Sequence, residues 1–281
     1  MERRVRQPVV AGAFYPGQRE ELTRAVSALL GEEIERGSSS LLSPCGLIAP
    51  HAGYPYSGPT AAAGYRAVAS RGRPDLVVVL GANHTGFGGA IVLDDHEVWR
   101  TPLGDVPVAG DIAEKLVSAG WSVDRSTFAR EHSVEVQLPF LQVLWGDAFR
   151  IVPVCVQWAD RGTLADAGRT LASVLRATGA ALVVASSDFT HYEPDEIARR
   201  RDHRAIEPIL DLDPERFLKL CEAERLSICG AGAIAILMHA ARELGLANAS
   251  LVDYSTSGDT SGDRSAVVGY AAVSFCRRSD G

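Results

Sequence analysis

Apolar runs that stop abruptly at a polar loop recur along this chain and limit the folds open to it. Three such runs lie at 47–49, 76–80 and 180–186. His51, His84 and Asp188 follow them within a few residues. Short apolar runs bounded by turn residues are typical of buried strands. Open α/β sheets bind their ligands at the carboxyl ends of such strands. The pattern therefore predicts buried strands that carry polar side chains to one edge of a sheet.

Segments with apolar residues at helical spacing separate these runs. Helices are predicted at 20–30, 60–70, 108–119, 131–138 (continuing through a kink at Pro139), 164–177, 196–210, 214–223 and 230–244. Further strands are predicted at 150–157, 251–255 and 266–275, with a hairpin formed by 90–93 and 97–100. The Ser-rich stretch 32–43 predicts a mobile loop. Strands alternate with helices and no composition shift marks a boundary. We therefore predict one α/β domain over residues 1–281, with a central mixed, mostly parallel sheet flanked by helices.

Composition excludes some classes of function. The 281 residues carry a net charge of −7, which argues against a nucleic-acid-binding protein because such a protein needs clustered Lys and Arg. No apolar run approaches the ~20 residues needed to span a bilayer, and no signal peptide is recognisable at the N-terminus. Five cysteines without paired short spacings indicate reduced thiols. We expect a cytoplasmic protein without a membrane or nucleic-acid partner.

The polar residues at the strand ends suggest a metal site. A single histidine in such a place is more often structural than a ligand. Convergence of His51, His84 and the pair Asp188 and His191 on one sheet edge favours function. Two histidines and a carboxylate suit non-haem Fe(II), and the same donors suit a catalytic zinc with an open position. Spacing alone leaves both metals open.

Cys229 precedes Gly230 at the start of an apolar helix. A helix N-terminus favours the thiolate and lowers the thiol pKa. This thiolate would complete a site with His51 and His84 and shift its preference toward copper(I) or zinc. The alternative is a small buried residue at a helix start.

Glu131, His132 and Glu135 stand close together in the sequence. On the predicted helix, His132 and Glu135 are three residues apart and share a face. Such a pair would support proton transfer or orient a ligand, whereas the alternative is a charged helix end. The Gly- and Asp-rich loop 257–263 invites a phosphate or a hard cation, but it lacks the P-loop and EF-hand patterns, so a plain surface turn is favoured.

Motifs along nearly the whole chain resemble those of one family. They are Val10-Ala11-Gly12-Ala13-Phe14-Tyr15-Pro16, Ala49-Pro50-His51-Ala52-Gly53-Tyr54, Leu80-Gly81-Ala82-Asn83-His84, Glu131-His132-Ser133-Val134-Glu135, Ser186-Ser187-Asp188-Phe189-Thr190-His191-Tyr192, Cys229-Gly230 and Tyr254-Ser255-Thr256-Ser257-Gly258-Asp259. In this order they resemble the Memo family, called AmmeMemoRadiSam system protein B in prokaryotes. The resemblance implies a fold similar to that of the class III extradiol dioxygenases, which use non-haem iron.

The resemblance also implies roles for particular residues. It carries a metal site to His51, His84 and Cys229, and it implies that Asp188 and His191 line the same pocket. His191 resembles the acid–base histidine of the dioxygenases. Cys229 departs from the dioxygenase pattern, in which a glutamate is the third ligand.

Three hypotheses for the function follow from this resemblance. The first is a non-haem iron oxidoreductase acting on a small aromatic diol. Its metal ligands are His51, His84 and Cys229, its catalytic residues are His191, Asp188 and His132, and its substrate-binding residues are Tyr54 and Tyr192. The second is a non-enzymatic module that binds iron, copper or a peptide within a complex, and the third is a metal-dependent hydrolase. Fe(II) is the expected cofactor, with copper and zinc as alternatives. The resemblance implies a radical SAM (S-adenosylmethionine) protein and an AMMECR1-like protein as partners.

Overall fold

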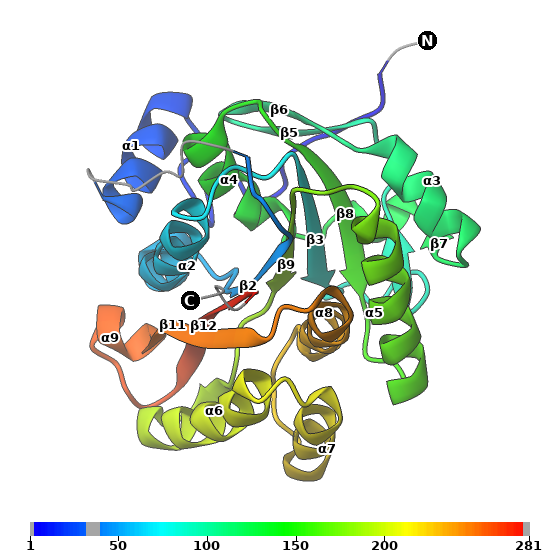
Figure 1. Cartoon of the computed structure of the whole chain (residues 1–281). Coiled ribbons are helices and arrows are strands. Elements are labelled where there is room, and N and C mark those ends of the chain that lie inside the picture. The colour runs from blue at the N-terminus through cyan, green and yellow to red at the C-terminus, as the bar shows by residue number, and fades with distance from the viewer. Residues whose placement is uncertain (1–2, 32–39, 278–281) are drawn as a thin grey trace.

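A nine-stranded mixed sheet lies at the centre of the molecule in the computed structural model, which describes residues 3–31 and 40–277 (Figure 1). Its strands, in spatial order, are β10 (His191–Glu193), β12 (Val267–Cys276), β2 (Cys45–Ala49), β9 (Ala181–Ser186), β3 (Leu76–Ala82), β8 (Arg150–Val156), β4 (Ile91–Leu93) and β7 (Ser122–Val123), and β11 (Asn248–Thr256) pairs with β12. A small second sheet contains β1 (Val5–Arg6), β5 (Val98–Thr101) and β6 (Gly104–Pro107). Most of the predicted mobile loop 32–43 lies outside the described residues.

The four central strands are parallel, and this arrangement positions the candidate site. β2 pairs with β9, β9 with β3, and β3 with β8, all in parallel. Antiparallel partners flank this block, β12 beside β2 and β4 beside β8. Because parallel strands end at the same edge, β2, β9 and β3 release the chain side by side. The predicted α/β class with a central mixed sheet is confirmed.

Helices cover both faces of the sheet (Figure 1). They are α1 (Arg19–Leu30), α2 (Tyr54–Ala69), α3 (Gly110–Ser118), α4 (Leu138–Trp145), α5 (Arg161–Arg176), α6 (Asp195–Leu210), α7 (Pro214–Glu224), α8 (Ala231–Leu244) and α9 (Ser257–Ser261). Successive residues of β3 pack into different cores. Val77 and Val79 join the core formed with α1, α2 and α4, whereas Val78 and Leu80 join the core of α3, α5 and α8. This alternation explains why the central strands are apolar without a polar face.

The predicted hairpin is wrong. β4 lies in the large sheet between β8 and β7, whereas β5 lies in the small sheet between β1 and β6. The two segments have strand-forming composition, but their short separation does not decide which strands they pair with.

The predicted helix at Glu131 is also wrong at its start. Residues 131–134 form a turn, a 3₁₀ helix follows at Glu135–Gln137, and α4 begins at Leu138. The Glu131 carboxylate accepts hydrogen bonds from the N–H groups of His132 and Ser133, which holds the chain in a non-helical turn. Pro139 lies in the first turn of α4, where its missing N–H costs no helical hydrogen bond. The expected kink is therefore absent.

The loop at 257–263 is an ordered turn. It begins with α9, whose start carries a reciprocal capping box between Thr256 and Asp259. Asp259 also pairs with Arg199 and Arg264. These contacts use the carboxylate internally, as expected of a structural turn.

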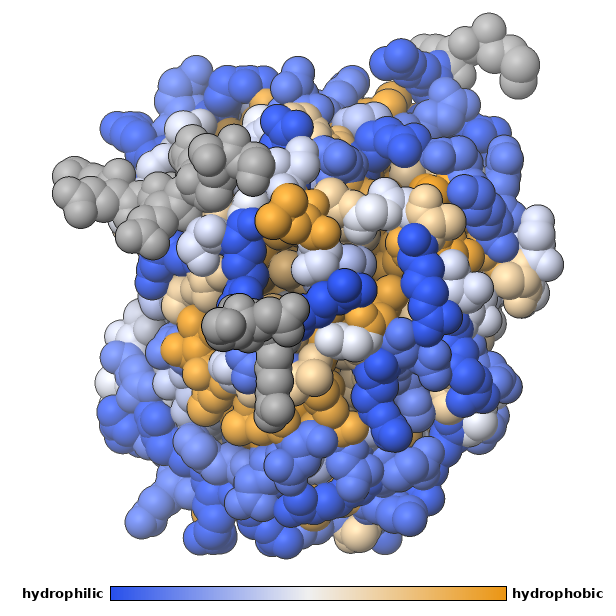
Figure 2. All heavy atoms as spheres, in the orientation of Figure 1, coloured by the Kyte–Doolittle hydropathy of each residue, from blue (hydrophilic) through white to orange (hydrophobic). Residues whose placement is uncertain are grey.

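The face of the molecule shown in Figure 2 is largely hydrophilic, with apolar residues gathered near its middle. Among the described residues, no helix is both long enough and apolar enough to cross a membrane.

Candidate metal centre

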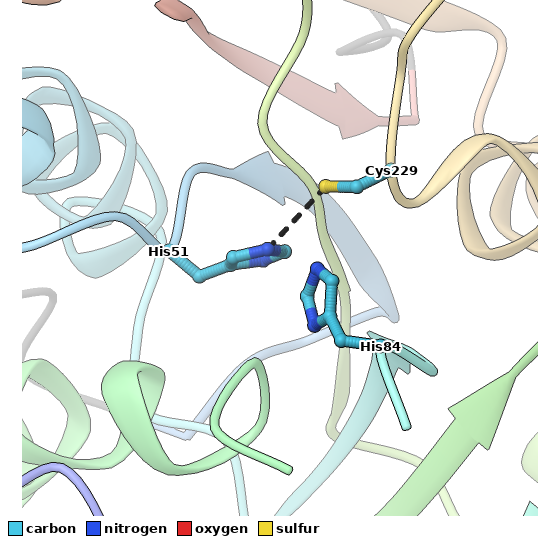
Figure 3. A group of neighbouring side chains, drawn as sticks. All are labelled: His51, His84 and Cys229. Carbon is cyan, nitrogen blue, oxygen red and sulfur yellow. Dashed lines mark hydrogen bonds between the residues drawn. The ribbon is translucent and has the colours of Figure 1, made fainter. Parts of the chain in front are cut away.

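Three side chains from distant parts of the chain converge at the carboxyl edge of the sheet (Figure 3). His51 follows β2, His84 follows β3, and Cys229 precedes α8. Ligand-type atoms of the three residues all lie within 4.8 Å of one another. The Sγ atom of Cys229 is 3.3 Å from Nε2 of His51. Separate elements therefore bring together the donor set expected from the sequence.

Two glycines allow this close approach. A Cβ atom on Gly230 would lie 2.6 Å from Cβ of Ser187 and 2.7 Å from the carbonyl oxygen of Ser186. Only glycine therefore lets the chain beside Cys229 pack against the end of β9. A Cβ on Gly81 would lie 2.4 Å from Oγ of Ser133, so glycine there admits the turn at 131–134.

Glu131 fixes His84. Its fully buried carboxylate accepts hydrogen bonds from the backbone N–H of His84 at 2.7 Å and from the ring Nδ1 at 3.0 Å. Burial alone would raise the pKa of Glu131, but the hydrogen bond and charge of His84 and backbone N–H donors lower it to about 2. Burial would lower the pKa of His84, yet its bond to Glu131 raises it overall. The anion holds the ring proton on Nδ1 and leaves Nε2 toward the site.

His51 lies in a different environment. It is 1 % exposed, and its Nδ1 is 2.9 Å from Oγ of Ser186. Burial lowers the pKa of His51, and the neighbouring His84 and His132 lower it further. Neutral imidazole is the form that binds metals.

Asp188 lies beside His51 but not among the converging ligand atoms. Its Oδ1 accepts the backbone N–H of His51 at 2.8 Å, and its own N–H points to Sγ of Cys229 at 3.2 Å. Burial raises the pKa of Asp188 to about 6. A carboxyl group in this state exchanges protons near neutral pH.

The prediction that the helix N-terminus lowers the pKa of Cys229 is wrong for the metal-free chain. Burial raises the pKa of this thiol well above its ordinary value, and the charge of Asp188 raises it further. Desolvation outweighs the helix dipole here. A metal ion that binds the sulfur must therefore displace a proton.

His132 and His191 flank the converging residues. The ring of His132 stacks on His84 with centroids 4.7 Å apart, and it meets His51 edge to face. Nδ1 of His191 contacts the carbonyl oxygens of Phe189 and Ser227 at 2.7 and 2.8 Å. Because carbonyls only accept, Nδ1 of His191 carries a proton, and Nε2 is the ring nitrogen not engaged by these carbonyls.

Glu135 does not join His132 on a common helix face. It is fully buried and ion-paired with Arg6, and it accepts the hydroxyl of Tyr15 at 2.6 Å. Its carboxylate therefore fastens the N-terminal segment rather than serving the site.

The two predicted substrate-binding tyrosines differ in exposure. Tyr54 is 4 % exposed, packs against Phe140, and donates its hydroxyl to the carbonyl of Val136. The structure therefore does not present Tyr54 to solvent. Tyr192 is 79 % exposed beside His191 and has a positive φ of 60°, a strained conformation for a non-glycine residue.

Sequence reasoning missed several residues that surround the ligands. Glu131 with His84 and His132 forms a second group whose ligand-type atoms lie within 4.8 Å of one another. Ser186 and Gln137 form hydrogen bonds behind His51. The available signals were that Ser186 ends a predicted strand, that Glu131 lies near His132, and that both residues stand within the family motifs.

The donor set fits a transition metal. Nε2 of His51 lies 3.3 Å from the sulfur of Cys229, and Glu131 holds the Nδ1 proton of His84, so imidazole nitrogens and a thiol converge at one place. Imidazole and thiolate suit zinc, copper and iron. The His84 side chain is 35 % exposed, which leaves the position open to solvent.

Comparison with known proteins agrees with these observations. A family model described as "Memo-like protein" matches residues 6–274. A MEMO1 family protein of Methanopyrus kandleri is 42 % identical over 280 residues, covering 97 % of this chain and 99 % of the relative. One from Pyrobaculum aerophilum is 44 % identical over 283 residues, covering 98 % and 100 %.

A solved structure shares the fold at lower identity. The crystal structure of an uncharacterized protein from Escherichia coli K12 has a TM-score of 0.56 and 15 % identity, covering 82 % of this chain and 98 % of that protein. At this identity the likeness concerns the fold alone. The family resemblance of the motifs is confirmed by the match over residues 6–274 and by relatives of full length: this chain belongs to the Memo family.

Proposed function

We propose that this chain is a metal-dependent oxidoreductase in which His51, His84 and Cys229 hold Fe(II), and that its substrate is a small aromatic diol. The observation that carries the proposal is the convergence of these three ligand-type atoms within 4.8 Å. A redox metal bound there would supply Lewis acidity toward the diol oxygens and redox chemistry toward O2.

The chain's own groups would handle protons and orientation. His191 has its Nδ1 proton held by two carbonyls, so its Nε2 is the atom that would take a proton from a diol hydroxyl. Asp188 lies close enough to His191 that a positive charge on that ring lowers the pKa of the Asp188 carboxyl group. His132 stacks on His84 and supports the ring orientation of that ligand. Tyr192 would contact the substrate at the exposed rim.

The direct test is anaerobic loading with Fe(II), followed by a panel of catechols and measurement of O2 uptake. We expect uptake with at least one catechol, and loss of most of the rate in His191→Gln with iron still bound. His203→Gln is a matched control, because His203 lies on α6 and its ring contacts Tyr254 rather than the site. Bound iron without O2 uptake across the panel would reject the enzymatic proposal.

A second candidate function is metal binding without turnover. The observation that favours it is the thiol of Cys229, a soft ligand where the dioxygenases resembled by this chain carry a glutamate. Soft ligands favour copper(I). Titration of wild type and Cys229→Ser with copper(I) and Fe(II) separates the two functions. Tight copper(I) binding that disappears in Cys229→Ser, without catechol turnover, would support the binding function.

A further inference from the structure

A chain of buried hydrogen bonds runs behind His51. The Tyr65 hydroxyl lies 2.8 Å from Oε1 of Gln137, and Nε2 of Gln137 lies 2.7 Å from Oγ of Ser186. Oγ of Ser186 is 2.7 Å from the carbonyl oxygen of Ser133 and 2.9 Å from Nδ1 of His51. The side chains that form these hydrogen bonds are buried, so water does not substitute for a missing partner.

The carbonyl groups of Pro50 and Ser133, which accept hydrogen bonds from this network, determine the position of each hydrogen. Gln137 lies 3.0 Å from the carbonyl oxygen of Pro50, which only accepts hydrogen bonds. The amide nitrogen, rather than the amide oxygen, must therefore face both Pro50 and Ser186. The amide oxygen then accepts the hydroxyl of Tyr65.

The same reasoning orients the Ser186 hydroxyl. The Ser133 carbonyl only accepts, so the single hydroxyl hydrogen of Ser186 lies in the 2.7 Å contact between them. The Ser186 oxygen already receives a hydrogen from Gln137, and it has one acceptor position left. His51 must fill that position with a hydrogen on Nδ1. The opposite tautomer would set the lone pair of Nδ1 of His51 against a lone pair of the Ser186 oxygen in a buried place.

We propose that Ser186, held by Gln137, is a positioning residue that fixes His51 as its Nδ1–H tautomer, so that the lone pair of Nε2 faces Cys229 and the metal position. This inference rests on the proposed metal-binding function. It identifies a neutral counterpart to Glu131, which performs the same task for His84 with a charge.

A neutral hydroxyl at position 186 is favoured over a carboxylate by the groups around His51. His51 already has the carboxyl group of Asp188 at its backbone N–H and the sulfur of Cys229 at its Nε2. A carboxylate at position 186 would add another negative charge to this buried region, whereas a hydroxyl fixes the proton without adding charge.

The first test is the tautomer of His51 in the metal-free wild-type protein. Imidazole ¹⁵N chemical shifts, assigned with His51→Gln, distinguish Nδ1–H from Nε2–H directly. We expect Nδ1–H. Observation of Nε2–H in wild type would overturn the proposal without the need for any further variant, and the result does not depend on whether a metal binds.

The second test compares variants at position 186. Ser186→Ala should mix the two tautomers or switch His51 to Nε2–H, and should weaken the binding of Fe(II) and Zn(II) about 10- to 100-fold in chelator competition. Ser186→Thr keeps the hydroxyl and should restore both readouts. Ser274→Ala, at another buried serine in β12, is the matched control and should change neither.

The outcomes separate the two proposals. A folded Ser186→Ala that keeps pure Nδ1–H and wild-type affinity would overturn the positioning role. A wild type with Nδ1–H that binds neither metal would contradict the proposed function, and with it the purpose assigned to Ser186, while leaving the hydrogen-bond directions intact.

Discussion

The Glu131 side and the Asp188 side of the candidate metal centre hold two buried carboxyl groups in opposite states. Glu131 receives two hydrogen bonds from His84 and one each from the N–H groups of His132 and Ser133, and its pKa falls to about 2. Asp188 receives the N–H of His51, and burial raises its pKa to about 6.

Burial raises the pKa of both carboxyl groups, but only for Glu131 do the hydrogen bond and charge of His84 and the backbone donors outweigh it. Glu131 is a fixed anion that organises a turn and a ligand. For Asp188, burial outweighs its backbone donors and the nearby imidazoles, which costs stability but lets the carboxyl group change its protonation near neutral pH.

Glu131→Ala should produce the largest effect. It leaves the donors on His84, His132 and Ser133 without their buried acceptor, so we expect a loss of about 3–5 kcal/mol in the free energy of unfolding. Urea denaturation of the metal-free protein measures it. Glu131→Gln keeps one acceptor oxygen, so its free energy of unfolding should lie between those of wild type and Glu131→Ala. A loss below about 1 kcal/mol in the alanine variant would show that the donors find other partners.

Asp188→Asn should instead increase the free energy of unfolding. The folded pKa of about 6 lies above the ordinary value of 3.8, so stability contributed by the protonated group is present below pH 3.8 and is lost as pH rises through 6. A rise of about 2 pH units corresponds to about 3 kcal/mol. We expect the asparagine variant to gain up to that amount at pH 7.5 and nearly nothing at pH 3.5. Equal gains at both values would contradict the raised pKa.

Cys229→Ser should weaken metal binding on the Asp188 side without unfolding the protein. We expect at least a 10-fold loss of affinity for Zn(II). Because burial raises the pKa of the wild-type thiol, metal must displace its proton, and wild-type affinity should increase with pH more steeply than that of the variant. Cys276→Ser, at a buried cysteine in β12, provides the control. Parallel pH profiles for wild type and Cys229→Ser would exclude the sulfur as a ligand.

Arg150→Ala should have the smallest effect and sets the baseline for the others. Arg150 and Asp111 form an exposed ion pair at 2.6 Å, and Arg150 lies at the start of β8, at the opposite end of the parallel strands from the candidate site. Exposed pairs contribute little because water screens them, so we expect a change below about 1 kcal/mol. Thermal unfolding detects it, and a larger loss would mean that solvent screening is overestimated for this surface.

The alternation of apolar runs and amphipathic segments was enough to predict the α/β class, the central strands and most helices. The runs before His51, His84 and Asp188 are each continuous enough to identify a buried strand. The candidate ligands His51, His84 and Cys229 were first grouped because two of them follow predicted strands and the third precedes a predicted helix. The family motifs then supported the same set, since spacing along the chain carries no sign of proximity.

Other features depend on contacts between distant residues and could not be predicted from the sequence. The turn at Glu131 forms because its side chain binds backbone groups, including that of His84, 47 residues away. Ser186 meets His51 across 135 residues of chain. The raised thiol pKa of Cys229 arises from burial, which local sequence does not report.

His51 and Cys229 are 178 positions apart in the sequence, and this separation bears on how the protein matures. A chain emerging from the ribosome exposes both histidines long before the cysteine, and contacts between such distant residues form late in folding. The complete three-ligand set therefore exists only after β9 has joined the sheet and α8 has docked. Metal acquisition would then be a post-translational event that reports completed folding, and a truncated or stalled chain would hold at most the two histidine ligands.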